Sequence, residues 1–121
     1  MDKWEALHSF WSSFSIPAYE ENSVPDKDDL IYPYITYEAV DSGFDSDVNA
    51  SASVWSRSFS WLAADTISNT IYDRLKNGGE TILYDGGMIW ITAGTPFSHS
   101  MGDPEDDRIK RKLLSIDYHF A

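Results

Sequence analysis

The chain has 121 residues, a length typical of one domain, and its 42% hydrophobic and 15% aromatic content is sufficient for a packed core. It contains no cysteine, which excludes disulfides, thiolate metal sites and cysteine nucleophiles. The formal net charge of −11 argues against specific nucleic-acid binding, because phosphate is bound by clustered Lys and Arg.

The sequence shows no sign of membrane insertion or export. No window approaches the ~18 consecutive apolar residues of a membrane span. The N-terminal stretch Met1-Asp2-Lys3-Trp4-Glu5 lacks the basic and then apolar order of a secretory signal. We therefore expect a single domain over residues 1–121 that is made in a cytoplasm and has no membrane partner.

The N-terminal third predicts one helix and one strand. Apolar side chains recur at helical spacing, at Trp4, Leu7, Trp11 and Phe14. This spacing predicts a helix over 2–15, capped by Asp2 and ended before Pro17. Residues 17–29 are expected to be irregular, and 30–40 to form a strand with Pro33 at its start or at a sheet edge. A turn around Gly43 follows, within 41–47.

In the middle of the chain the spacing of apolar residues changes from every second residue, typical of a strand, to every third or fourth residue, typical of a helix. Residues 50–61 alternate and predict a strand, with one face carrying Trp55, Arg57, Phe59 and Trp61. Helical spacing then predicts a second helix over 62–77 that Gly78-Gly79 ends, with an apolar face made by Ala63, Ile67, Ile71 and Leu75.

The C-terminal third predicts three strands. Segments 80–84 and 88–93 are joined by Asp85-Gly86-Gly87, a hairpin turn that needs positive φ. Residues 94–107 are expected to be a loop, and a last strand runs from near Arg108 to Phe120. The order α-β-β-α-β-β-β predicts an α+β domain in which two helices pack on one face of a mostly antiparallel sheet of about five strands. Mostly buried positions should be Trp4, Trp11, Ile67, Ile71, Ile91, Leu114 and Ile116.

No pattern for catalysis or for a cofactor is present, so we expect no enzyme, no cofactor and no tight metal site. His8, His99 and His119 lie far apart, without metal-ligand spacing. The acids of 41–47 and of 103–107 lack the ordered calcium loop with its turn glycine and final glutamate. The aromatic side chains of the 50–61 strand are typical of a core under the helices; the alternative is a carbohydrate- or peptide-binding face.

An acidic block is followed directly by a basic block. Four acids occur between Asp103 and Asp107, and four bases between Arg108 and Lys112. Adjacent blocks of opposite sign suit an interface between protein subunits. The candidate interface residues are Asp103, Glu105, Asp106, Asp107, Arg108, Lys110 and Arg111.

Several stretches together resemble a family of small tail-completion proteins of bacteriophages with long, non-contractile tails. In the C-terminal half they are Gly78-Gly79, Tyr84-Asp85-Gly86-Gly87, Gly94-Thr95-Pro96 and the run from Met101-Gly102-Asp103-Pro104 to Arg111. In the N-terminal half they are Ile16-Pro17-Ala18-Tyr19, Val24-Pro25, Tyr34-Ile35-Thr36-Tyr37 and Trp55-Ser56-Arg57-Ser58.

This resemblance implies a tail terminator, a structural protein of the virion. Such proteins are thought to form a hexameric ring at the head-proximal end of the tail tube, where the ring stops polymerisation and offers a surface to the head. The implied partners are further copies of the chain, the major tail tube protein and the head-closure or neck protein. A head-closure protein of the same virion is the first alternative, and the binding module is the second.

Overall fold

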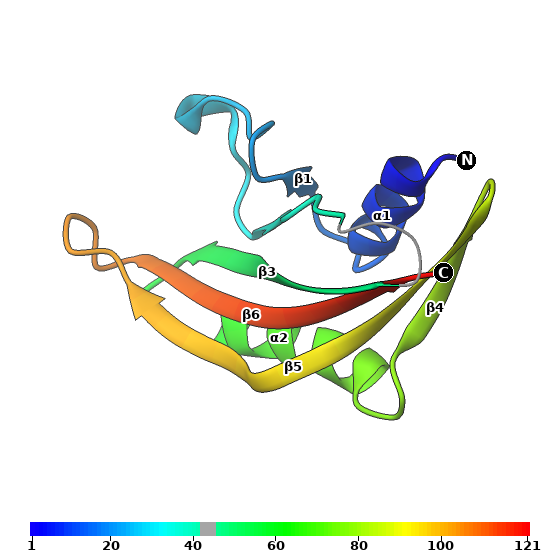
Figure 1. Cartoon of the computed structure of the whole chain (residues 1–121). Helices are drawn as coiled ribbons and strands as arrows, with labels where there is room; N and C mark the ends of the chain where they lie inside the picture. The colour runs from blue at the N-terminus through cyan, green and yellow to red at the C-terminus, as the bar shows by residue number, and fades with distance from the viewer. Residues whose placement is uncertain (42–45) are drawn as a thin grey trace.

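The computed structural model describes residues 1–41 and 46–121. In this part of the chain, two α-helices and a six-stranded sheet form an α+β domain (Figure 1). The elements are α1 (Lys3–Ser12), β1 (Ala18–Glu20), a 3₁₀ turn η1 (Lys27–Asp29), β2 (Tyr34–Tyr37), β3 (Ser46–Arg57), α2 (Leu62–Leu75), β4 (Glu80–Tyr84), β5 (Gly87–Gly102) and β6 (Ile109–Phe120). The expected class is confirmed, but the sheet has one strand more than the sequence indicated.

The strand order is β1-β2-β3-β6-β5-β4, and only the β1–β2 pair is parallel. β1 lies within 17–29, so the irregular connection expected there is partly wrong. Three residues are too few for a periodic pattern, and the strand exists because it pairs with β2. β2 begins directly after Pro33, as expected of a proline that has no N–H to donate.

Helix α1 begins with a reciprocal capping box between Asp2 and Glu5. Its buried face contains Leu7, Phe10 and Trp11, but Trp4 is 43% exposed, contrary to expectation. Lys3 takes the inward position instead, since its ammonium lies 5.3 Å from the centre of the Phe120 ring. The aliphatic part of the Lys3 side chain covers apolar surface in place of the Trp4 ring, and its ammonium group stays at the edge of the core.

Strand β3 spans Ser46–Arg57 rather than 50–61. It pairs along its whole length with β6, from Ser46 opposite Phe120 to Arg57 opposite Ile109. Phe59 and Trp61 therefore lie beyond the strand, and the aromatic strand face predicted for 50–61 does not form. The turn expected around Gly43 falls on 42–45, which lie outside the described residues.

Strand β5 continues to Gly102, so the loop expected over 94–107 is largely wrong. A register shift between Ala93 and Ser98 absorbs Gly94 and Pro96, after which the strand pairs with β6 again. β4 pairs only with the first five residues of β5, from Gly87 to Ile91. Beyond that point β5 is an edge strand, where a proline costs no hydrogen bond to a neighbour.

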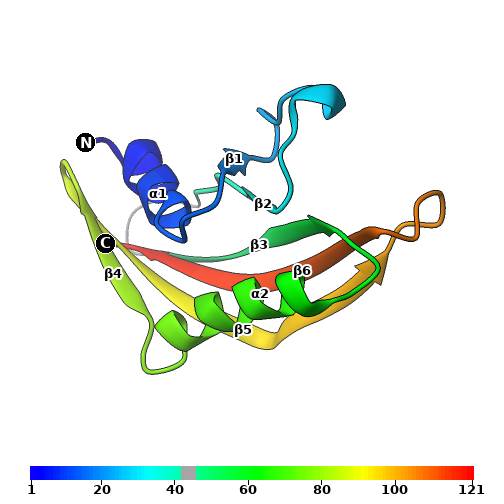
Figure 2. The same ribbon diagram turned by 180° about the vertical axis from the view of Figure 1, so that it is seen from behind.

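Both helices pack on one face of the sheet, as expected. Asp65 of α2 pairs with Lys112, and Trp11 of α1 bonds to Tyr118; these β6 residues are six apart and so face the same side. Arg74, near the end of α2, lies 4.4 Å from the centre of the Phe14 ring. Figure 2 shows α2 lying along β5 and β6.

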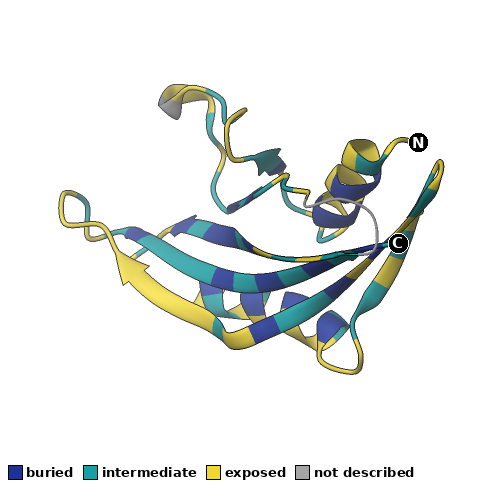
Figure 3. Cartoon of the chain, in the orientation of Figure 1, coloured by how far each residue is buried: buried dark blue, intermediate teal, exposed yellow. Residues whose placement is uncertain are grey.

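The core lies between the helices and this inner face of the sheet. Trp11, Ile71, Ile91, Leu114 and Ile116 are buried as predicted, and Ile67 is half-buried. In the described part of the chain no helix lies on the opposite, outer face, and most residues of that face are half-buried or exposed; Figure 3 shows the burial of each residue along the chain. Trp55 lies on that outer face, because it is one residue out of phase with buried Val54. The aromatic core expected around Trp55 is therefore wrong.

Candidate functional site

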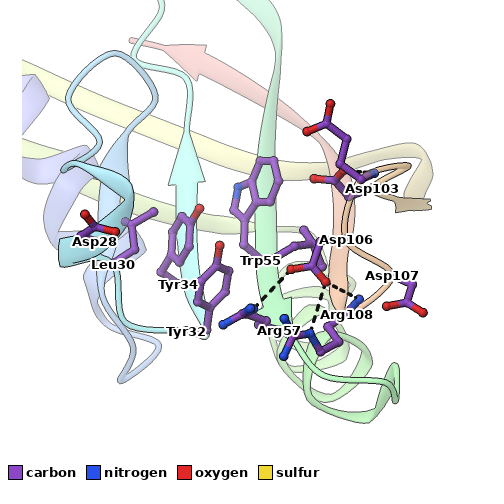
Figure 4. A pocket seen from close by; sticks show the side chains of 12 residues that line it. Asp28, Leu30, Tyr32, Tyr34, Trp55, Arg57, Asp103, Asp106, Asp107 and Arg108 are labelled. Atoms are coloured by element: carbon purple, nitrogen blue, oxygen red, sulfur yellow. Dashed lines mark hydrogen bonds and ion pairs between the residues drawn. The ribbon is translucent and has the colours of Figure 1, made fainter.

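A cleft of about 830 Å³ opens at the end of the sheet where β3 ends and β6 begins. One wall is the segment that carries Asp28 and Leu30, and the other is the β5–β6 connection over 103–108 (Figure 4). Tyr32, Tyr34 and Trp55 lie between these walls. The cleft thus joins parts of the chain that are far apart in sequence.

The aromatic floor of the cleft is held rigidly. The rings of Tyr34 and Trp55 are stacked at an interplanar angle of 11°, and the Trp55 indole donates to Thr36 over 3.0 Å. Behind Trp55, the guanidinium of Arg111 lies 4.7 Å from the ring centre. Burial, with the neighbouring Tyr32, raises the pKa of Tyr34 to about 12, so its hydroxyl stays neutral.

Asp106 organises the charged end of the cleft. Its carboxylate accepts from the main-chain N–H of Arg108 at 3.0 Å and from the guanidinium of Arg108 at 3.3 Å, and it pairs with Arg57 at 3.4 Å. These contacts, led by the Arg108 main-chain bond, hold the pKa of Asp106 below its usual value. Asp106 therefore fixes both guanidinium groups at the mouth of the cleft.

The structure brings together five of the seven candidate interface residues and separates two. The cleft is lined by Asp103, Glu105, Asp106, Asp107 and Arg108. Lys110 faces the inner side, with its ammonium 5.6 Å from the Trp61 ring, and Arg111 lies on the outer side behind Trp55. Consecutive strand residues point to opposite faces, so the basic block cannot act as one surface.

The rest of the cleft was not found from the sequence. Its other lining residues are Asp28, Leu30, Tyr32, Tyr34, Trp55, Arg57 and Ile109. Two patterns in the sequence could have pointed to the floor of the cleft. One is the pair Tyr32 and Tyr34 on both sides of Pro33, and the other is the alternation that places Trp55 and Arg57 on one strand face. Neither pattern shows that 28–34 and 103–108 face each other.

The histidines lie in separate elements: His8 in α1, His99 in β5 and His119 in β6. His8 contacts the Tyr37 hydroxyl at 2.9 Å, and His119 contacts Asp47 at 2.6 Å. Among the described residues, no group of three or more His, Asp or Glu side chains is placed to hold a metal ion. The acidic run 41–47 lies partly outside the described residues.

Two exposed apolar patches lie at opposite ends of the sheet. The hairpin patch consists of Leu83, Met88 and Trp90 on the outer side of β4 and β5, with exposed fractions of 75%, 41% and 45%. The corner patch consists of Phe59, in the turn after β3, and Leu62, the first residue of α2, with exposed fractions of 76% and 72%. Along β6 these ends are separated by eleven residue steps, roughly 36 Å.

The corner patch is presented by an ordered turn. The main-chain N–H of Ser60 donates to the Ser58 hydroxyl, and that of Leu62 donates to the Ser60 hydroxyl, each over 3.1 Å. The N–H of Ser58 in turn donates to the carbonyl of Arg108 over 2.7 Å. Phe59 is therefore exposed on a turn that is hydrogen-bonded to the 103–108 wall of the cleft.

Comparison with models of protein families, with curated proteins and with solved structures gives no match. None of the helices in the described residues has the length and apolarity needed to span a membrane.

Proposed function

We propose that this chain is a structural subunit that assembles head to tail into a ring, and that the ring caps a bacteriophage tail tube as a tail terminator. The observation that carries the proposal is the pair of unlike apolar patches at opposite ends of one sheet. The resemblance of the stretches named above, in both halves of the chain, to tail-completion proteins supports a place for the ring in a virion.

The patches support a heterologous contact rather than a symmetric dimer. In a heterologous interface one surface meets a different surface of the next copy, and the chain of contacts closes as a ring if the rotation allows. The hairpin patch is broad and lies across two strands, whereas the corner patch projects as a turn with Phe59 at its tip. Burying Phe59 against a neighbour removes an exposed aromatic side chain from water, worth about 1.5–3 kcal/mol per contact.

The assembly test uses Phe59→Ser and Leu83→Ser, with Ile31→Ser as the matched control. All three side chains are more than 70% exposed, and Ile31 belongs to neither patch. Native mass spectrometry and negative-stain electron microscopy, with and without purified tail tubes, should show rings for the parent and for Ile31→Ser. The two patch variants should remain folded by circular dichroism and should not form rings.

The same assay separates the terminator from the head-closure alternative. A terminator ring binds isolated tail tubes and stops their growth, so tubes polymerised with the parent chain should be of uniform length. A ring that binds only to tail-less heads would instead identify a head-closure protein. Ring formation by Phe59→Ser and Leu83→Ser at parental yield would contradict the proposed contact.

A further inference from the structure

The cleft between 28–34 and 103–108 combines three features of a site for an extended, positively charged chain. It has a rigid aromatic floor, two facing walls and an excess of carboxylates. Five carboxylates and two guanidinium groups line it, a net of three negative charges. A cation that enters such a cleft gains from the carboxylates and from the half-buried ring of Tyr32, while Tyr34 and Trp55 pack beneath it.

The carboxylates differ in how far they are already neutralised. Asp106 contacts Arg57 and Arg108, as described above. The carboxylates of Asp28, Glu105 and Asp107, by contrast, form no ion pair within the described residues. Asp28 lies on the segment that forms one wall and Asp107 on the connection that forms the other, with the aromatic side chains between the two segments (Figure 4).

The described basic side chains of a second copy of this chain are poorly suited to supply the cation. The structure describes eight basic side chains, and six are already paired with carboxylates: Lys3, Arg57, Arg74, Lys76, Arg108 and Lys112. The other two are placed against tryptophan rings, Lys110 at Trp61 and Arg111 at Trp55.

We propose that this cleft binds an extended, arginine- or lysine-containing segment of a different protein, with a cationic side chain over the half-buried ring of Tyr32 and between the two acidic walls. The inference rests on the proposed function only in making that protein a neighbour in the virion. The acidic connection over 103–108 then forms one wall of the binding site for the partner. Asp106 pairs with Arg57 and Arg108 and so keeps their guanidinium groups from occupying the cleft.

The test is a titration of the full chain with a capped pentapeptide that has two arginines among glycines. The readout is the set of nuclear magnetic resonance signals from the five tryptophan indole N–H groups, because Trp55 alone among them lines the cleft. We expect a saturable shift of the Trp55 signal, with an affinity that falls as salt is raised from 20 to 300 mM, because the added ions screen the exposed charges. The same peptide with citrulline in place of arginine, which keeps the shape without the charge, should leave the signal unmoved.

Two double variants locate the binding. Glu105→Gln with Asp107→Asn removes two charges from one wall and should weaken binding about threefold or more, as expected for two exposed charge contacts. Glu21→Gln with Asp73→Asn removes two exposed charges outside the cleft and should leave affinity within experimental error. Equal shifts with the citrulline peptide, equal weakening by both variants, or no shift at Trp55 would each overturn the proposal.

Ring assembly does not enter this measurement. The titration is repeated on Leu83→Ser, whose substitution lies at the far end of the sheet, and it should give the same affinity. If the parent chain binds the peptide but forms no ring on tail tubes, the proposed function is overturned and the cleft assignment stays intact. If the parent chain forms rings but does not bind the peptide, the cleft assignment is overturned and the proposed function stays intact.

Discussion

Replacing Tyr118 with Phe tests whether α1 is fixed to the sheet as the structure has it. The Tyr118 side chain is fully buried; its hydroxyl accepts from the Trp11 indole over 3.1 Å and donates to the Glu38 carbonyl over 3.3 Å. Burial raises the pKa of Tyr118, so the hydroxyl remains protonated and can donate. Tyr118→Phe keeps the ring and leaves the buried indole N–H without a partner, a loss that costs about 2 kcal/mol.

The assay is thermal and urea unfolding followed by circular dichroism. With an unfolding entropy of about 2.1 cal/mol/K per residue, a loss of about 2 kcal/mol lowers the Tm of this chain by about 8 °C. Tyr72→Phe is the matched control, because that ring is 41% exposed and should leave the Tm nearly unchanged.

A double-mutant cycle with Trp11→Phe isolates the bond. Because Trp11→Phe also removes the indole N–H, adding Tyr118→Phe to it should cost less than Tyr118→Phe costs alone. Equal costs in both backgrounds, or a Tyr118→Phe chain as stable as the parent, would refute the bonded arrangement of α1 on β6.

Three further predictions concern the caps, the turns and the cleft. Asp2→Ala should reduce the free energy of unfolding by about 1 kcal/mol in urea, because it removes the capping box of α1. Gly79→Ala should cost clearly more than Gly78→Ala: both have positive φ, but a Cβ on Gly79 would meet the Ile91 carbonyl oxygen at 2.3 Å, whereas Gly78 faces open space. The Asp106 carboxyl should titrate below its ordinary pKa of 3.8 in a nuclear magnetic resonance titration. Since the folded pKa is lowered, its contribution to stability is complete above the ordinary carboxyl pKa and is lost as the pH falls through the lowered folded pKa.

Local patterns sufficed for much of the fold. Asp2, Gly78-Gly79 and the Asp85-Gly86 turn end or join elements through short-range geometry, so the sequence placed both helices and the 80–93 hairpin correctly. Pairing with a distant strand decides the rest. β1 exists only because it pairs with β2, and β5 passes Gly94 and Pro96 because β6 continues beside it.

The cleft was less accessible to sequence reasoning than the fold. The acidic run over 103–107 stands out in the sequence, and in the structure it forms one wall of the cleft. The other wall and the floor come from 28–34 and from β3, and their approach depends on the sheet order β2-β3-β6. Charge blocks were also a poor guide to surfaces within a strand, because alternation sends Lys110 and Arg111 to opposite faces.

Cysteine cross-linking tests the head-to-tail contact most directly, because the chain contains no cysteine of its own. Ser60→Cys, beside Phe59 in the corner patch, and Thr81→Cys, opposite Trp90 in the hairpin patch, keep the apolar side chains of both patches. The two variants are prepared separately, allowed to assemble on tail tubes and then oxidised. If the corner patch of one copy meets the hairpin patch of the next, the mixture forms a disulfide-linked heterodimer, and each variant alone remains monomeric on a denaturing gel. A chain that carries both cysteines should give a ladder that ends at a closed ring. Efficient homodimers of either single variant, or rings that yield no cross-link in the mixture, would contradict the account.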